Sequence, residues 1–110
     1  MRRRQSLRKV SPKTLALRST RQEVVRAVHL RDGTCQFWHH CPRGLEGVPW
    51  ICAGPLDVHE IIPRSAWAMG QYRIDNTVLI CRIHHMWIDN HPLLAHEVGL
   101  HGFSYDRPDL

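Results

Sequence analysis

Residues 56–89 read LDVHEIIPRSAWAMGQYRIDNTVLICRIHHMWID and combine a His-Glu pair, an Asn and a His-x3-Asp sequence. His85 and Asp89 are four residues apart, and positions i and i+4 share one face of a helix, so this imidazole and this carboxylate can hold one divalent ion together. The apolar run at 58–62 is typical of a strand, and residues 77–80 form a second short β-prone run that leads into the helix. The stretch therefore predicts the order strand, loop, strand, helix.

This stretch resembles the HNH endonucleases, and most of all the small HNH proteins of bacteriophages. The segments HEIIPRS (59–65) and NTVLICRIHHMWIDNHP (76–92), followed by the Ala/Gly-Leu segment at 95–100, have close counterparts in those proteins in the same order. The resemblance covers roughly residues 20–100. It implies an α+β fold, a small zinc-stabilised ββα-metal domain, and a metal-dependent endonuclease that hydrolyses phosphodiester bonds in DNA.

The resemblance also implies a role for each residue of the stretch. His59, His85 and Asp89 would hold one catalytic divalent cation (Mg, Mn, Ni or Zn), Glu60 would be the general base, and Asn76 would orient the base. The family usually carries a His where this chain has Glu60, and a third His or an Asn is commoner at Asp89. An alternative is that Glu60 helps to hold the metal and His59 is the base. Adjacent strand residues normally face opposite sides, so a regular strand would present only one of the two to the site.

A structural zinc site is the second expectation from the resemblance, which implies a Cys pair in the loop-rich region 33–56 and a second pair before the catalytic helix. The second pair is Cys81-x-x-His84, with His in place of the usual Cys. The predicted ligands are Cys35, Cys41, Cys81 and His84. The ligand that accompanies Cys35 stays open, because the x5 spacing to Cys41 is wide and His39, His40 and Cys52 are competitors. Buried free thiols are the alternative to a zinc site.

The charge of +5 is concentrated at the N-terminus. The first 21 residues contain eight of the 15 basic residues and no acidic residue, so the seven basic and ten acidic residues that follow leave the rest at −3. This pattern predicts a disordered basic arm over residues 1–18 that binds phosphate, and a nuclease domain over residues 19–110. A solubilising or targeting tail is the alternative. The expected DNA contacts are Arg2, Arg3 and Arg4 in the arm and Arg64, Arg73 and Arg82 in the domain.

One small domain is expected from a length of 110 residues, with a metal supplementing a modest core. A capping box at Thr20 and Glu23 and a stop at Asp32-Gly33 predict a scaffold helix between them. No apolar segment suggests a secretory signal or a membrane span. We therefore expect a cytoplasmic location, which for a phage protein is the host cytoplasm, where zinc is favoured over disulfides.

DNA is the expected partner, and the family resemblance adds a part in phage DNA packaging beside a terminase. Membranes are not expected as partners, and the chain is expected to be a monomer or a weak dimer. The second hypothesis is a zinc-stabilised DNA-binding module on an HNH scaffold that is catalytically weak or silent because Glu60 does not replace the missing His. A third is an accessory factor that uses the fold to dock on a packaging machine such as the terminase.

Overall fold

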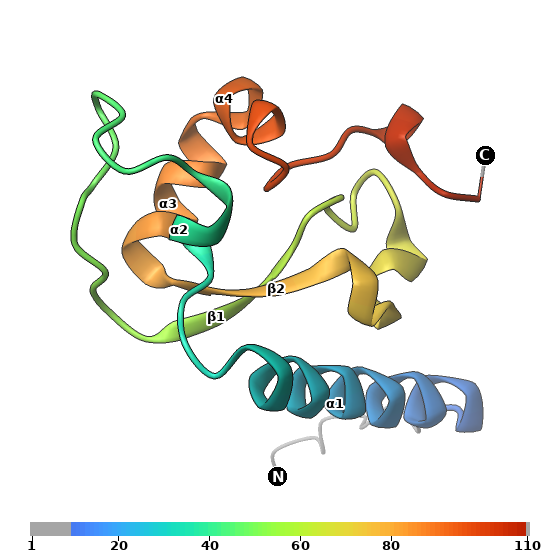
Figure 1. Ribbon diagram of the computed structural model, residues 1–110. Coiled ribbons are helices and arrows are strands. Elements are labelled where there is room, and N and C mark those ends of the chain that lie inside the picture. The colour runs from blue at the N-terminus through green and yellow to red at the C-terminus, as the bar shows by residue number, and fades with distance from the viewer. Residues whose placement is uncertain (1–9, 110) are drawn as a thin grey trace, which may run out of the picture.

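A computed structural model describes residues 10–109 of the chain (Figure 1). The fold is a small α+β arrangement in which a two-stranded antiparallel sheet lies between helices. The elements in order are α1 (Pro12–Asp32), α2 (Phe37–His40), β1 (Leu56–Glu60), β2 (Thr77–Cys81), α3 (Arg82–Asn90) and α4 (Pro92–Glu97), with short 3-10 turns at Ala68–Tyr72, Ile74–Asn76 and Ser104–Asp106. The predicted order strand, loop, strand, helix is confirmed for residues 56–90.

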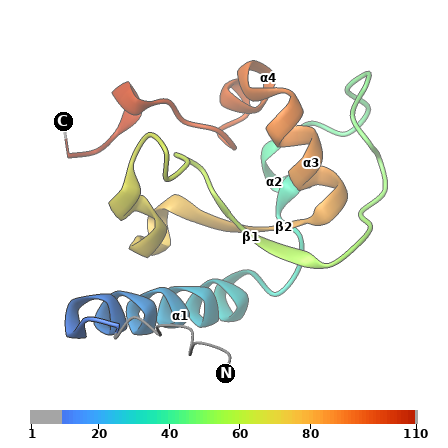
Figure 2. The same ribbon diagram turned by 180° about the vertical axis from the view of Figure 1, so that it is seen from behind.

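The sheet places two helical layers on opposite sides of β2. Strands β1 and β2 pair from Leu56 with Cys81 to Glu60 with Thr77. Figure 1 shows α1 on one side of the sheet and α2, α3 and α4 on the other, and Figure 2 shows the same arrangement from behind. All five residues of β2 are buried, because both faces of this strand are covered.

The two faces of β2 belong to two apolar clusters. On the α1 side, Leu79 packs with Val24 and Val28 of α1. On the other side, Val78 and Ile80 pack in a cluster completed by Phe37, Cys41, Trp87, Ile88, Ala95 and Leu100. Complete burial of an aliphatic or aromatic side chain contributes about 1.5–3 kcal/mol, so these two clusters position β2, and with it the start of α3.

Helix α1 begins earlier than the sequence predicts. The side chain of Ser11 caps the helix by accepting a hydrogen bond from the amide of Thr14 at 3.1 Å, and Pro12 occupies the first turn, where its missing N–H costs nothing. Thr20 is inside the helix, and its hydroxyl donates to the carbonyl of Ala16, so the expected capping box at Thr20 is not the start. The helix ends at Asp32, as predicted, with Gly33 at φ 70°.

The expectation of a disordered arm over residues 1–18 is therefore wrong for residues 12–18, which are helical. Residues 1–9 of that arm, with Arg2, Arg3 and Arg4, lie outside the described part of the chain. At 21 residues α1 is the longest helix, and no helix in the described part is both long and apolar enough to cross a membrane.

The C-terminal end of α1 is joined to the outer edge of β2. The carboxylate of Asp32 accepts a hydrogen bond from the amide of Leu79 at 2.9 Å, and the carbonyl of Leu79 accepts one from the amide of Gln36 at 2.8 Å. Arg31 donates to the carbonyls of Ile74 and Thr77. These contacts pair backbone groups of β2 and of the turn before it, and they fix α1 against the sheet.

Candidate metal centre and active site

Four side chains from four segments form a Cys/His cluster. Cys35 lies between α1 and α2, Cys52 lies in the long loop before β1, Cys81 ends β2, and His84 is in the first turn of α3. Their ligand atoms all lie within 4.8 Å of one another. The Nδ1 atom of His84 is 3.9, 3.6 and 3.2 Å from the sulfurs of Cys35, Cys52 and Cys81, respectively. The four residues are therefore close enough to hold a metal ion.

The surroundings of His84 prepare one of its ring nitrogens for this role. Its Nε2 lies 2.5 Å from the carbonyl oxygen of Pro49, and because a carbonyl only accepts, Nε2 carries the proton and Nδ1 is left with a lone pair. The ring is fully buried and stacks on Phe37 with centroids 3.9 Å apart. A backbone carbonyl that fixes the tautomer of a His in this way is typical of metal sites.

Among the three thiols, that of Cys81 shows the character of a metal ligand, whereas burial and the neighbouring Cys35 and Cys81 raise the pKa of Cys52 to about 12. Burial alone raises the pKa of Cys81, but hydrogen bonds from the backbone amides of His84 and Ala53 and from the thiols of Cys35 and Cys52 bring it below its ordinary value. The sulfur of Cys35 accepts a hydrogen bond from the amide of Cys81 at 3.2 Å. Metals bind the thiolate, so contacts that favour ionisation of Cys81 favour a metal. Three sulfurs and one imidazole nitrogen form a donor set that is consistent with a structural zinc.

The cluster corrects the prediction that Cys41 is a ligand. Cys41 is only 1% exposed, packs in the apolar cluster of Phe37, and its S–H points to the carbonyl of Pro42. Burial raises the pKa of this thiol, as expected for an inert core cysteine. Neither His39 nor His40 joins the cluster. Cys52, one of the competitors, takes the place assigned to Cys41.

The segment after Cys52 explains why this residue reaches the cluster. The amides of Arg82 and Ile83 at the start of α3 donate to the carbonyls of Pro55 and Ala53. The first amides of a helix have no partner within the helix, so this segment satisfies them. Gly54 permits the approach, because it has φ 82° and a Cβ there would lie 2.8 Å from the Cβ of Arg82.

A second group of side chains meets where β1 faces α3. His59 is buried on β1, His85 lies on α3, and their ring centroids are 5.0 Å apart. Both line a cavity of about 300 Å³ together with Asp89. The other lining residues are Val58, Glu60, Pro63, Arg64 and His101. The structure therefore brings together the three residues that the sequence predicts as ligands of a catalytic cation.

Hydrogen bonds fix the tautomers of both histidines in this cavity. The Nε2 of His59 donates to the carbonyl of Leu100 at 2.6 Å, and the Nδ1 of His85 donates to Asp57 at 3.0 Å. The second ring nitrogen of His59 is left with a lone pair, and the second ring nitrogen of His85, its Nε2, lies 3.9 Å from the carboxylate of Asp89. Burial, offset in part by the bond to Leu100, lowers the pKa of His59 to about 4, so this ring is neutral at pH 7, which is the form that binds metals.

Asp57 links this group to Arg82. Its two oxygens accept hydrogen bonds from the Arg82 guanidinium at 2.7 and 3.0 Å. The bond to Arg82, with a further contribution from His85, outweighs burial and lowers the pKa of Asp57 to about 2. The carboxylate is therefore ionised at neutral pH and orients the ring of His85. It was not singled out from the sequence, although its position two residues before His59 on a strand places it on the same face.

The ligand atoms of the three residues expected to bind the catalytic cation lie farther apart than those of the Cys/His cluster. Among residues 10–109, the Cys/His cluster is the one group of three or more His, Cys, Asp or Glu residues whose ligand atoms all lie within 4.8 Å of one another. All the same, one cavity is lined by His59, His85 and Asp89. Each of the two histidines has one ring nitrogen bound to a protein acceptor, and imidazole and carboxylate are donors that suit a divalent cation. The donor types of these residues thus suit such an ion, and Asp89 is the most exposed of the three, with a side chain that is 67% exposed.

Glu60 lies on the opposite face of β1 from His59, as strand alternation requires. Its carboxylate pairs with Arg64 at 2.5 Å and with Arg21 of α1 at 3.4 Å, and its side chain is only 10% exposed. Glu60 still borders the cavity, because it is the last residue of the strand. Its oxygens are thus engaged by two guanidinium groups.

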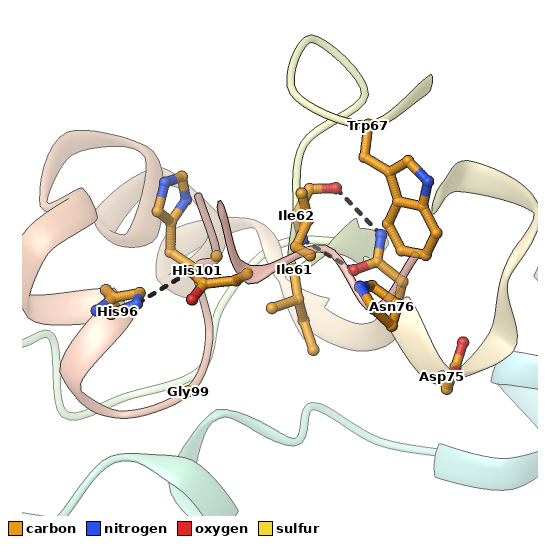
Figure 3. Close-up of a pocket in the computed structure, with 11 residues that line it drawn as sticks. Ile61, Ile62, Trp67, Asp75, Asn76, His96, Gly99 and His101 are labelled. Carbon is orange, nitrogen blue, oxygen red and sulfur yellow. Dashed lines mark hydrogen bonds and ion pairs between the residues drawn. The ribbon is translucent and has the colours of Figure 1, made fainter. Parts of the chain in front are cut away.

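Asn76 holds the ends of the loop between the strands together. Its Oδ1 accepts from the amide of Ile62 at 3.0 Å, and its Nδ2 donates to the carbonyls of Ile62 and Gly70. Figure 3 shows this side chain between Ile62 and Trp67, at a cavity of about 360 Å³ that lies beside the one lined by His59. Asn76 is therefore a buried clamp that sets the course of the chain directly after His59 and Glu60.

The three arginines predicted to contact DNA differ in their surroundings. Arg82 pairs with Asp57, and Arg73 pairs with Asp75 while its guanidinium lies over the ring of Trp67. Arg64 lines the His59 cavity, and its side chain is 57% exposed. Arg64 is also ion-paired, with Glu60, and of the three it is the one that lines this cavity.

Comparison with known proteins adds no relative to this description. No protein-family model, no curated protein and no solved structure matches the chain. The function therefore has to be inferred from the Cys/His cluster and from the cavity between β1 and α3.

Proposed function

We propose that this protein is a metal-dependent endonuclease of the HNH type that hydrolyses phosphodiester bonds in DNA. The observation that carries the proposal is the pairing of His59 on β1 with His85 on α3. The two rings are 5.0 Å apart, each has one nitrogen bound to a protein acceptor, and both line a cavity with Asp89. A strand, a loop clamped by Asn76, a second strand and a helix position these side chains, which is the arrangement that the sequence resemblance implies.

In this proposal His59, His85 and Asp89 would hold a divalent cation. Such an ion stabilises the charge that develops on the phosphate and on the departing oxygen. Asp57 and the carbonyl of Leu100 hold the two imidazoles in the tautomers that the role requires. Arg64, exposed at the cavity, binds a phosphate of the substrate.

In this proposal Glu60, which the family resemblance puts in the general-base position, removes the proton from the attacking water, and it borders the cavity at the end of β1. Its carboxylate first has to be released from Arg64, and a DNA phosphate that binds Arg64 competes for the same guanidinium. Substrate binding would thus free one side of Glu60, while Arg21 continues to hold the other at 3.4 Å.

A structural zinc at Cys35, Cys52, Cys81 and His84 completes the proposal. Its ligands join the α1–α2 connection, the long loop before β1, and the junction of β2 with α3. His85 directly follows the ligand His84, so the same site that stabilises the fold fixes the first turn of the helix that carries the catalytic residues.

The ion pairs of Glu60 favour a second candidate function. If Arg21 and Arg64 keep Glu60 occupied, the site lacks a base, and the protein would be a zinc-stabilised DNA-binding or terminase-accessory module with weak or no cleavage. Both candidates share DNA as the partner. They differ in whether the His59 cavity performs chemistry.

The test is nicking of supercoiled plasmid by the purified protein with added Mg²⁺, Mn²⁺, Ni²⁺ or Zn²⁺. We expect metal-dependent nicking by the wild type, its loss in His85→Ala, and its retention in His39→Ala, in which an exposed histidine outside both sites is replaced. Circular dichroism and zinc content establish that both variants fold. DNA binding without nicking by the wild type would select the second candidate, and equal nicking by a folded His85→Ala would reject the proposed site.

A further inference from the structure

A segment after α4 brings one more histidine to the candidate active site. The carbonyl of Leu100 accepts the hydrogen bond from His59, and the amide of Gly102 donates to the carbonyl of Ile61 at 2.8 Å. His101 lies between these two attachments. Its backbone is therefore fastened on both sides to the end of β1, the strand that carries His59.

Packing contacts surround this attachment. Leu100 is fully buried in the apolar cluster on the α3 side of the sheet. Gly102 is so close to the loop after β1 that a Cβ there would lie 2.6 Å from Cγ1 of Ile62. The ring of His101 meets that of Phe103 edge to face, with centroids 4.8 Å apart. These contacts fix both the position of His101 and the course of the chain around it.

The side chain of His101 lines the same cavity as His59, His85 and Asp89. It also borders the neighbouring cavity in Figure 3, so it stands between the two. Burial, followed by the charge of His96, lowers the pKa of His101, and the nearby carboxylates of Asp89 and Asp106 offset this only in part.

We propose that His101 is a further ligand of the divalent cation in this cavity, which would make the site one of three imidazoles and one carboxylate. The inference rests on the proposed function, because it concerns the same cation. It also names the class of metal. Imidazole suits transition metals such as Co²⁺, Ni²⁺ and Zn²⁺, whereas Mg²⁺ prefers oxygen ligands and gives up its waters reluctantly. The site would thus take a transition metal in preference to Mg²⁺.

The test is calorimetric titration of full-length, zinc-loaded protein with Co²⁺ and with Mg²⁺, without DNA. We expect one Co²⁺ to bind beyond the structural zinc, and Mg²⁺ to bind far more weakly. His101→Ala should weaken Co²⁺ binding by at least the 10- to 100-fold that is typical of losing an outer contact to a metal ligand. His96→Ala is the matched control, because His96 lies in α4 and pairs with Asp106 but does not line the His59 cavity.

Two further variants keep the outcome interpretable. His101→Gln, which retains the size of the side chain, should reproduce the loss if His101→Ala fails to fold, and His101→Asp, which supplies another ligand atom, should restore part of the affinity. Wild-type affinity in folded His101→Ala and His101→Gln, together with a loss in His85→Ala, would overturn the inference and leave the proposed function standing. Absence of any Co²⁺ site beyond zinc in the wild type would reject the proposed function and this inference with it.

Discussion

At the scale of single residues, the candidate site depends on how each imidazole is held. The Nε2–H of His59 donates a hydrogen bond to the carbonyl of Leu100, and the Nδ1–H of His85 donates one to the carboxylate of Asp57. Neither partner is itself a proposed ligand, yet each decides which nitrogen of the ring is left for a metal. The carbonyl of Pro49 does the same for His84 in the Cys/His cluster. In both sites, therefore, a hydrogen bond to an acceptor outside the ligand set determines which imidazole nitrogen can bind a metal.

His59 makes the stability of the protein dependent on pH. Burial lowers the pKa of His59 from 6.5 to about 4. Between these two pH values His59 is therefore protonated in the unfolded chain and neutral in the folded chain. Stability is then fully present above about pH 6.5 and is lost as the pH falls towards 4. We expect urea unfolding of zinc-loaded protein to show a larger loss of free energy from pH 7 to pH 5 in the wild type than in His59→Gln, whose amide can still donate to Leu100.

The comparison with His59→Gln isolates the contribution of His59, because every other histidine and every carboxylate is present in both proteins. Equal losses in the two proteins between pH 7 and pH 5 would show that His59 is not buried in the way described. A larger loss in His59→Gln would contradict the direction of the pKa shift.

At the scale of elements, the attachment of α1 to β2 can be tested at one side chain. The Asp32 carboxylate accepts from Arg31 and from the amide of Leu79, and the bond to Arg31, outweighing burial, keeps its pKa below the ordinary value. Asp32→Ala would leave the amide of the fully buried Leu79 without a partner. An unsatisfied buried donor costs about 1–3 kcal/mol, and we expect a loss of that size in the free energy of unfolding.

The matched control for this change is Asp109→Ala, which removes an exposed ion pair with Arg107. Exposed pairs contribute about 0–1 kcal/mol, so the control should unfold close to the wild type in the same urea titration. Similar behaviour of the two variants would show that Asp32 is not a structural link between α1 and β2.

The zinc proposal separates two cysteines that look alike in the sequence. Cys52→Ser removes a proposed ligand, so zinc content should fall below one per chain and the melting temperature should drop, since metal binding contributes to folding. Cys41→Ser changes a core thiol and should retain zinc, although burial of a hydroxyl lowers stability. Elemental analysis of both purified variants gives the decisive comparison. Full zinc in Cys52→Ser and loss in Cys41→Ser would restore the ligand set favoured by the sequence.

These elements show what the sequence could and could not reveal. The strands, α3 and the end of α1 follow from local signals, namely alternation, helical spacing and Asp32-Gly33, and all three are found. The start of α1 was misplaced because Thr20 and Glu23 form a capping pattern that competes with the one at Ser11. Cys52 could not be chosen over Cys41, because its place depends on a loop of irregular backbone whose course is set by contacts with α3.

The site was likewise anticipated in part. The family resemblance groups His59, His85 and Asp89, and the three residues line one cavity, while their role as metal ligands stays a prediction. Asp57, Leu100 and His101 were missed, since two of them come from the segment after α4 and no spacing in the sequence relates that segment to β1. Contacts between distant segments are what a single sequence conceals.

At the scale of the whole molecule, the uneven charge predicts how the protein meets DNA. Residues 1–9 contain five basic residues, and Lys13, Arg18 and Arg26 are exposed along α1, whereas the chain from residue 22 onward is net acidic. Each phosphate that a cation neutralises adds about −0.9 to the slope of log affinity against log salt. We expect deletion of residues 1–9 to flatten this slope by up to about 4–5 and to leave zinc and Co²⁺ binding unchanged.

The measurement is fluorescence anisotropy of a labelled duplex over a range of salt concentrations, with Co²⁺ titration as the parallel readout. A second variant, with Lys13, Arg18 and Arg26 changed to Ala, isolates the contribution of α1 and should flatten the slope by no more than about 3. If the deletion leaves the slope unchanged while the helix variant lowers it, DNA is bound by the folded helix and the N-terminal residues serve another purpose. A slope that neither variant alters would exclude this end of the molecule from the DNA interface and leave Arg64 beside the His59 cavity as the remaining contact.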